Sequence, residues 1–153
     1  MDQEASRTSE PSAGTPYATL FKLAVLATVF GIGHHIDHLL RADHLGWPLI
    51  SEVTPFTYSL GIYPFIVVGL YLHARGQIGP GYWVLLTTIG ALFVGLSHFG
   101  PLAVEPPEHI VGSYRSNAAG YAAVAWLITF VLVLVGIAIY GARLWLRARR
   151  GSQ

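Results

Sequence analysis

Cysteine is absent from this 153-residue sequence, and charged residues make up only 11% of it. Without cysteine the chain has no disulfide bond, no thiolate metal site and no cysteine nucleophile. A soluble globular domain carries about a quarter charged residues, whereas hydrophobic residues form 53% of this chain. The composition therefore indicates an integral membrane protein rather than a soluble domain.

Other common signatures are missing as well. The net charge is only +1, so no basic surface for nucleic acid is expected. The sequence contains neither a glycine-rich phosphate-binding loop nor a serine–histidine–acid order typical of hydrolases. Membrane lipid is the partner that the composition indicates, and a homo-oligomer or a larger membrane complex is left open.

Four apolar segments are long enough to cross a bilayer as α-helices. They cover residues 17–40, 55–73, 81–99 and 117–145. We therefore predict an all-α integral membrane protein, a four-helix bundle that forms one domain over residues 17–145. Residues 1–16 are polar and lack periodicity, which predicts a disordered tail, and residues 146–153 form a basic tail.

Local signals refine the predicted spans. Pro55 follows a threonine, which is typical of a helix start. Pro64 lies inside the second span and predicts a kink there. In the fourth span, small residues around Gly120 predict close packing against another helix.

The basic residues predict the orientation of the four spans. Seven of the nine lie in the two tails, at their edges or in the loop between the second and third spans: Arg7, Lys22, Arg75, Arg143, Arg147, Arg149 and Arg150. Basic residues are enriched on the cytoplasmic side of membrane proteins. We therefore expect a multi-pass protein of the cell membrane with both termini in the cytoplasm.

With that orientation, six of the seven histidines lie on the extracytoplasmic side: His34, His35, His38, His44, His98 and His109. Most of them belong to the stretch GIGHHIDHLLRADHLGWP, which follows directly on the apolar part of the first span. Ionisable side chains at the edge of a span are costly to desolvate, so they indicate a functional site.

The spacing of these histidines predicts a metal site. His34 and His38 are four residues apart and share one face of a helix, and His98 is expected at a similar depth in the third span. Three imidazoles with an open position suit zinc or iron. His109 is a fourth candidate ligand.

Nearby charged residues are candidates for the remaining roles at this site. Asp37 and Glu108 are the candidate general bases. Arg41 and Glu105 are candidates for contacting a cofactor, an anion or a headgroup. Asp37 and Arg41 are also four residues apart, so a simple ion pair explains them equally well.

Haem b is the alternative cofactor. Gly31 and Gly33 precede His34, and Gly95 precedes His98, which leaves the backbone bare enough for a porphyrin between the first and third spans. The same glycines are equally explained by helix packing, their commoner use in membranes.

The predicted function is a metal-dependent enzyme in which a metal-activated water acts on a lipid-soluble or headgroup substrate. Redox chemistry with haem b or a quinone is the second enzyme class. The non-catalytic alternative is an accessory subunit or a transporter component whose polar rim contacts a partner. The sequence leaves open whether the protein is an enzyme.

Overall fold

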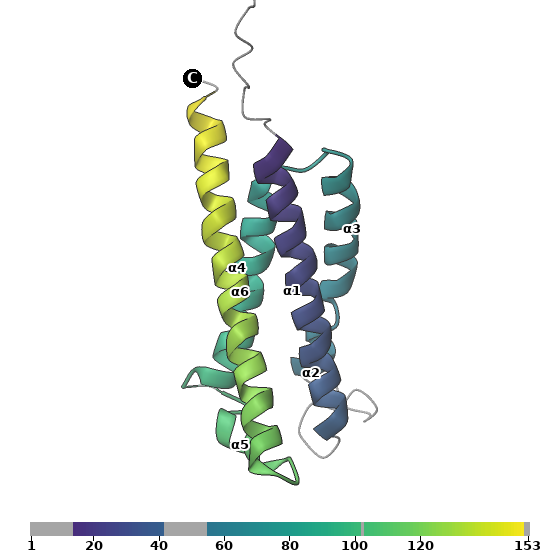
Figure 1. Cartoon of the computed structure of the whole chain (residues 1–153), viewed down its shortest axis with the longest axis vertical. Coiled ribbons are helices and arrows are strands. Elements are labelled where there is room, and N and C mark those ends of the chain that lie inside the picture. Colours follow the sequence, from purple (N-terminus) through teal and green to yellow (C-terminus); the bar gives the residue numbers. More distant parts are fainter. Residues whose placement is uncertain (1–13, 42–54, 102, 152–153) are drawn as a thin grey trace, which may run out of the picture.

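The computed structural model describes residues 14–41, 55–101 and 103–151, and over these residues the chain is helical without a strand. In chain order the helices are α1 (Gly14–Arg41), α2 (Pro55–Ser59), α3 (Ile62–Ala74), α4 (Pro80–Phe99), α5 (Pro107–Gly112) and α6 (Asn117–Arg150) (Figure 1). The predicted all-α fold is confirmed for this part of the chain. Most of the predicted N-terminal tail and His44 lie outside the described residues.

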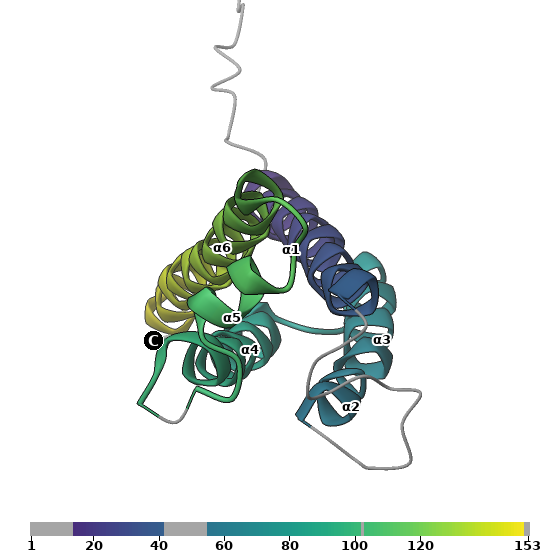
Figure 2. The same ribbon diagram turned by 90° about the horizontal axis from the view of Figure 1, so that it is seen from below.

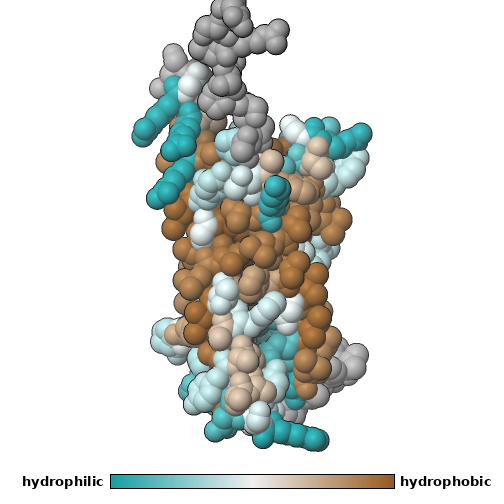
Figure 3. All heavy atoms as spheres, viewed as in Figure 1, coloured by the Kyte–Doolittle hydropathy of each residue, from teal (hydrophilic) through white to brown (hydrophobic). Residues whose placement is uncertain are grey.

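Four helical segments are long and apolar enough to cross a membrane, as predicted. They are Pro16–Arg41, Phe56–Ala74, Pro80–Phe99 and Asn117–Arg150. Large apolar side chains such as Val29, Leu85 and Leu132 are more than half exposed, and Figure 3 shows a hydrophobic belt across the middle of the face drawn. These features suggest a multi-pass membrane protein whose apolar surface faces lipid.

The long helices run alongside one another, and α1 begins at the same end of the molecule at which α6 ends (Figure 1). We call this the terminal end and the opposite one, where α5 lies, the α5 end. Helix α6 packs along both α4 and α1, while α3 packs mainly on α1 (Figure 2). The buried core therefore lies between α1, α4 and α6 and includes Leu20, Trp83, Leu127, Phe130 and Ile137.

Glycine lets α1 and α6 approach closely. A Cβ atom at Gly33 would lie 2.5 Å from the Trp126 ring, and the Trp126 indole donates a hydrogen bond to the carbonyl of Phe30 at 3.1 Å. Gly31 likewise faces the ring of Phe130. In the structure these two glycines thus serve the packing of α6 on α1, which is the helix-packing use weighed against a porphyrin site.

Helices α3 and α4 meet near the terminal end. There the Tyr82 hydroxyl donates to the carbonyl of Phe65 at 2.6 Å, and a Cβ atom at Gly69 would clash with the Tyr82 ring at 2.4 Å. Over its length α3 packs on α1 rather than on α4.

The second span is interrupted one turn before the proline that predicted a kink. Its helix begins at Pro55, as expected, but is interrupted at Leu60 and Gly61, and Pro64 lies in the first turn of α3. Pro64 has no N–H to donate to the carbonyl four residues earlier, that of Leu60, and its ring crowds this carbonyl. The predicted irregularity is therefore present, as a break of the helix at Leu60 and Gly61.

The connector after α4 contains the short helix α5, which packs on the start of α6. Ile110 of α5 is 1% exposed. A Cβ atom at Gly120 would lie 2.6 Å from the Cα atom of Val111, so only glycine permits this contact. The small residues around Gly120 predicted close packing of α6 against another helix, and in the structure that helix is α5. Helix α6 itself begins after Ser116, whose hydroxyl accepts from the Ala119 N–H at 3.3 Å.

Candidate metal site

Three of the predicted histidine ligands meet at the α5 end of the bundle. His34 and His38 lie one turn apart on α1, and His98 lies near the end of α4. All three are buried, with 3–7% of each residue exposed. One ring nitrogen from each lies within 4.8 Å of the others. We call these three residues the histidine cluster.

The imidazole rings of the cluster are in mutual contact. Their centroids are 4.7 Å apart for His34 and His38, 5.2 Å for His34 and His98, and 5.8 Å for His38 and His98. Bonds from zinc to imidazole nitrogen are about 2.1 Å, so two nitrogens of one tetrahedral zinc ion lie roughly 3.4 Å apart. Binding of zinc would therefore require the three rings to move closer together.

His34 is the residue that most needs a partner. It is 6% exposed, and among the described residues its ring has no hydrogen bond and no ion pair. Its neighbours are other rings, including Phe130 with a centroid distance of 5.8 Å. A buried imidazole without a hydrogen-bonding partner is costly. Coordination of an ion would satisfy one of its nitrogens.

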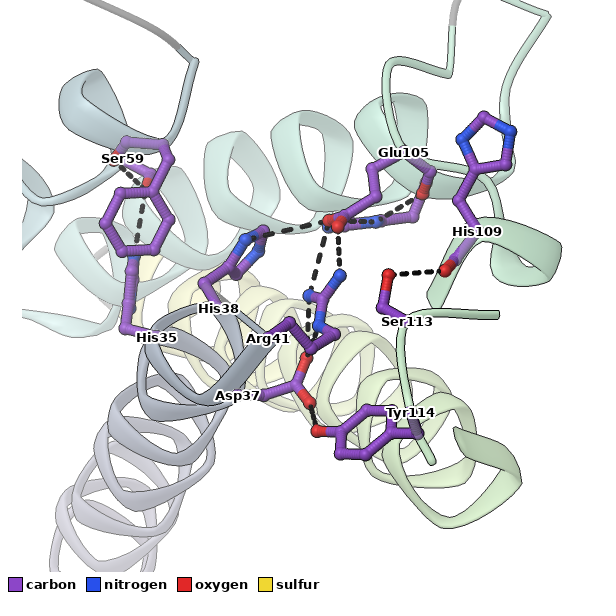
Figure 4. Close-up of polar contacts among 11 residues, drawn as sticks. His35, Asp37, His38, Arg41, Ser59, Glu105, His109, Ser113 and Tyr114 are labelled. Carbon is purple, nitrogen blue, oxygen red and sulfur yellow. Dashed lines mark hydrogen bonds and ion pairs between the residues drawn. The ribbon is translucent and has the colours of Figure 1, made fainter. Parts of the chain in front are cut away.

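Glu105 holds the other two histidines. The Nδ1 atom of His98 lies 2.8 Å from the Glu105 carbonyl oxygen, to which it donates as N–H. One carboxylate oxygen of Glu105 lies 3.6 Å from Nδ1 of His38 (Figure 4). The same oxygen lies 3.8 Å from Nδ1 of His98. A hydrogen bond at Nδ1 fixes the tautomer and leaves Nε2 of His98 able to bind an ion.

Arg41 lies behind Glu105 in a buried network of charges. Its side chain is completely buried, with Nη2 2.7 Å from Oδ2 of Asp37 and with Nη1 bonded to the Glu105 carboxylate (Figure 4). A buried guanidinium between two carboxylates is expensive to break, because any partner left alone is an uncompensated charge. Arg41 therefore fixes the position of Glu105 beside the histidines, and its predicted contact with a cofactor or headgroup stays a prediction.

Tyr114 completes this network from the connector between α5 and α6. Its hydroxyl donates a hydrogen bond to Asp37 (Figure 4). Burial, followed by that hydrogen bond, raises the pKa of Tyr114 to about 12. The phenol therefore stays neutral and keeps donating at any physiological pH. No signal in the sequence pointed to this residue.

The other predicted site residues lie elsewhere. His109 and Glu108 are exposed on α5 and do not join the histidine cluster, and in Figure 4 the His109 ring points away from Glu105. Asp37 is bonded to Arg41 and Tyr114. General-base roles for Asp37 and Glu108 stay predictions, whereas the carboxylate that lies beside the cluster is that of Glu105.

His35 points away from the cluster and connects α1 to the second span. Its Nε2 atom lies 2.8 Å from the Ser59 hydroxyl, and its Nδ1 atom lies 2.8 Å from both the Gly31 carbonyl and the Tyr63 hydroxyl. Both ring nitrogens thus have partners within the chain. This is the outcome expected for a residue about 100° around the helix from His34.

A cavity of about 390 Å³ lies beside the cluster, between α1, the second span, α4 and α6. His34, His35, His38, His98 and Glu105 line one part of it, and the rest of the lining is mostly apolar. A mostly apolar cavity with a few convergent polar groups is the usual form of a small-molecule site. The histidine cluster is therefore accessible from a space within the span region.

No family model, curated protein or solved structure matches this chain. Its site is therefore interpreted from its own residues. They form a possible four-span membrane protein with a buried cluster of three histidines that could hold a metal ion.

Proposed function

We propose that His34, His38 and His98 bind one transition metal ion, zinc or iron first, in the membrane-spanning bundle. The observation that carries this proposal is the convergence of three buried ring nitrogens to within 4.8 Å, where His34 has no other polar partner among the described residues. Three imidazoles are a common ligand set for catalytic zinc and leave a position for water or substrate.

The proposed activity is metal-dependent chemistry on a lipid-soluble substrate. An ion with three protein ligands supplies a bound water whose pKa falls to about 7, which makes it a nucleophile at neutral pH. Glu105 is the proposed proton acceptor, because its carboxylate lies beside two of the three histidines. The adjoining cavity supplies space for the substrate.

The proposed orientation places the histidine cluster on the extracytoplasmic side, near the membrane surface. It rests on the basic residues, seven of which belong in the sequence to the two tails, to their edges and to the loop between the second and third spans, and on the positive-inside rule. Reporter fusions at the C-terminus test it. A cytoplasmic signal is expected, and an extracytoplasmic signal would invert the orientation.

Metal content tests the proposed site. Elemental analysis of purified protein is expected to give one zinc or iron per chain, and His34→Ala and His98→Ala should each remove nearly all of it. His109→Ala and His73→Ala are the matched controls, because both histidines lie outside the cluster, and metal content should not change in either.

Two results would contradict this proposal. A Soret band that disappears with the same two variants would replace the ion by haem b. A folded protein that never retains metal, even after metal has been added and excess removed, would favour the non-catalytic alternative of an accessory subunit or transporter component.

A further inference from the structure

The cavity beside the histidine cluster opens sideways toward lipid. Five of its large lining residues are also exposed: Phe65 on α3 is 60% exposed, Ile89 and Phe93 on α4 are 53% and 41% exposed, and Tyr58 on α2 and Val104 after α4 are 72% and 48% exposed. The first three lie on the two helices that border the cavity on one side. We place the opening toward lipid between these helices, next to Phe65, Ile89 and Phe93.

Small residues on the opposite wall keep the space open. Helix α1 contributes Ala24, Ala27, Thr28 and Gly31 to the lining, and α4 contributes Gly90. Larger side chains at these positions would fill the volume, as packed cores normally do. The wall therefore provides room for a hydrocarbon chain that runs along α1.

The polar end of the cavity is suited to an uncharged oxygen-bearing head. The lining there includes Ser97, Ser59 and Tyr63. Nδ1 of His35 donates to the Gly31 carbonyl, so the Tyr63 hydroxyl keeps its proton free to donate to a carbonyl head. The Ser59 hydroxyl instead donates to the Phe56 carbonyl and can accept from a hydroxyl head. Among the described lining residues Glu105 is the one with a formal charge, and it is acidic. Arg41 is not in the lining and is bonded to Asp37 and Glu105.

From these features we propose that the cavity binds a neutral, membrane-soluble molecule with a carbonyl or hydroxyl head and a hydrocarbon tail. It enters between α3 and α4 and places its head at the histidine cluster. This proposal rests on the proposed function, for which it names the substrate class. A phosphorylated lipid headgroup is disfavoured by the protein itself, because the described lining contains no lysine or arginine to bind it and includes the acidic Glu105; the ion would be its one cationic partner.

The test uses decylubiquinone as the neutral probe and decyl phosphate as the anionic one, with the metal-loaded protein in phosphatidylcholine nanodiscs. Trp83 lines the cavity, so a quinone bound there is expected to quench its fluorescence. Saturable quenching is expected, and decyl phosphate should not compete once the ion has been removed with a chelator. Quenching that rises linearly without saturation, or equal competition by decyl phosphate in the metal-free protein, would overturn the proposal.

Matched variants locate the binding. Ala27→Phe fills the cavity and should weaken binding roughly tenfold or more, because overpacking excludes the probe. Val29→Phe on the same helix is the control, since Val29 is 53% exposed and does not line the cavity, and its affinity should not change. Equal affinity in both variants would overturn the proposed location.

Because Ala27→Phe could prevent folding, a second variant makes a smaller change in the cavity. Tyr63→Phe keeps the ring and removes the hydroxyl, so binding of decylubiquinone should weaken about fivefold, the value of one hydrogen bond. Tyr71→Phe, on the exposed side of α3, should leave the affinity for decylubiquinone unchanged, and equal binding by both variants would contradict the role of the polar end.

The metal content of the protein distinguishes a failure of this proposal from a failure of the proposed metal site. Metal without saturable binding refutes the substrate class alone, and saturable binding without metal refutes the metal site alone.

Discussion

Two histidines at opposite ends of the bundle have opposite surroundings. At the terminal end, His73 of α3 accepts a hydrogen bond at Nδ1 from the Trp83 indole at 2.8 Å, and its Nε2 lies 3.1 Å from the carbonyl of Tyr17. At the α5 end, His34 of α1 is buried among aromatic and imidazole rings and has no hydrogen bond with any described residue. Both histidines lie on helices that could span a membrane.

The difference separates a structural histidine from a candidate ligand. His73 uses both ring nitrogens to connect α1, α3 and α4, so the protein itself explains its presence. His34 costs free energy as it stands, because a buried polar ring without a partner has lost its hydration. A buried histidine can thus be a structural residue or a candidate metal ligand, and the hydrogen-bonding partners of its ring nitrogens distinguish the two.

The largest effect is expected from Arg41→Ala, which removes the cation that holds Asp37 and Glu105 at the α5 end. Two buried carboxylates would be left uncompensated, so the free energy of unfolding should fall by about 3–5 kcal/mol. Unfolding in mixed detergent micelles measures it. Arg115→Ala is the control, because Arg115 is exposed. An effect no larger than that of the control would mean that the network does not hold this end together.

A smaller effect is expected from Gly120→Ala, which forces α5 away from α6. The new methyl group would lie 2.6 Å from the Cα atom of Val111, and overpacking of this kind costs about 1–3 kcal/mol. Gly136→Ala in the same helix has no neighbouring atom within 4 Å. It should therefore be neutral or slightly stabilising in the same unfolding assay, and equal losses in both variants would contradict the proposed packing.

The smallest effect concerns Tyr114, at the edge of the network. Its pKa of about 12 in the fold, against 10.0 ordinarily, means that the folded state favours the neutral phenol. The resulting stabilisation is present below pH 10 and is lost as the pH rises toward 12. Tyr114→Phe should lower stability at neutral pH by about 1 kcal/mol and weaken this alkaline loss.

Tyr121→Phe serves as the control for that pH profile, because Tyr121 is 64% exposed. An alkaline unfolding profile that is identical in the wild type and in Tyr114→Phe would show that the phenol does not couple to the network. Among the described residues, His73 at the terminal end belongs to no such charged network. The alkaline loss of stability that depends on Tyr114 therefore reports on the α5 end alone.

The sequence predicts the helices well because long apolar segments in lipid have few alternatives to a helix. It also predicts the irregularity of the second span, because Pro64 has no N–H for the carbonyl of Leu60. It does not predict that the helix breaks completely at Leu60 and Gly61 and resumes at Ile62, rather than continuing with a bend.

The histidine cluster is predicted from helical spacing for His34 and His38 and from depth for His98. The partner carboxylate is not, because Glu105 and Glu108 flank the same pair of prolines. The start of α5 at Pro107 separates them and leaves Glu105 4% exposed and Glu108 exposed. The path of a connector follows no periodicity, so neither this choice nor the role of Tyr114 can be inferred from spacing.

X-ray absorption at the metal edge, on purified protein loaded with zinc, tests most directly whether the three imidazoles share one ion. The account predicts three imidazole nitrogens at about 2.0–2.1 Å from His34, His38 and His98, with nearly all of the bound zinc and its imidazole signal lost in His34→Ala and no change in His73→Ala. A spectrum without imidazole scattering, or one that is the same in all three proteins, would contradict it.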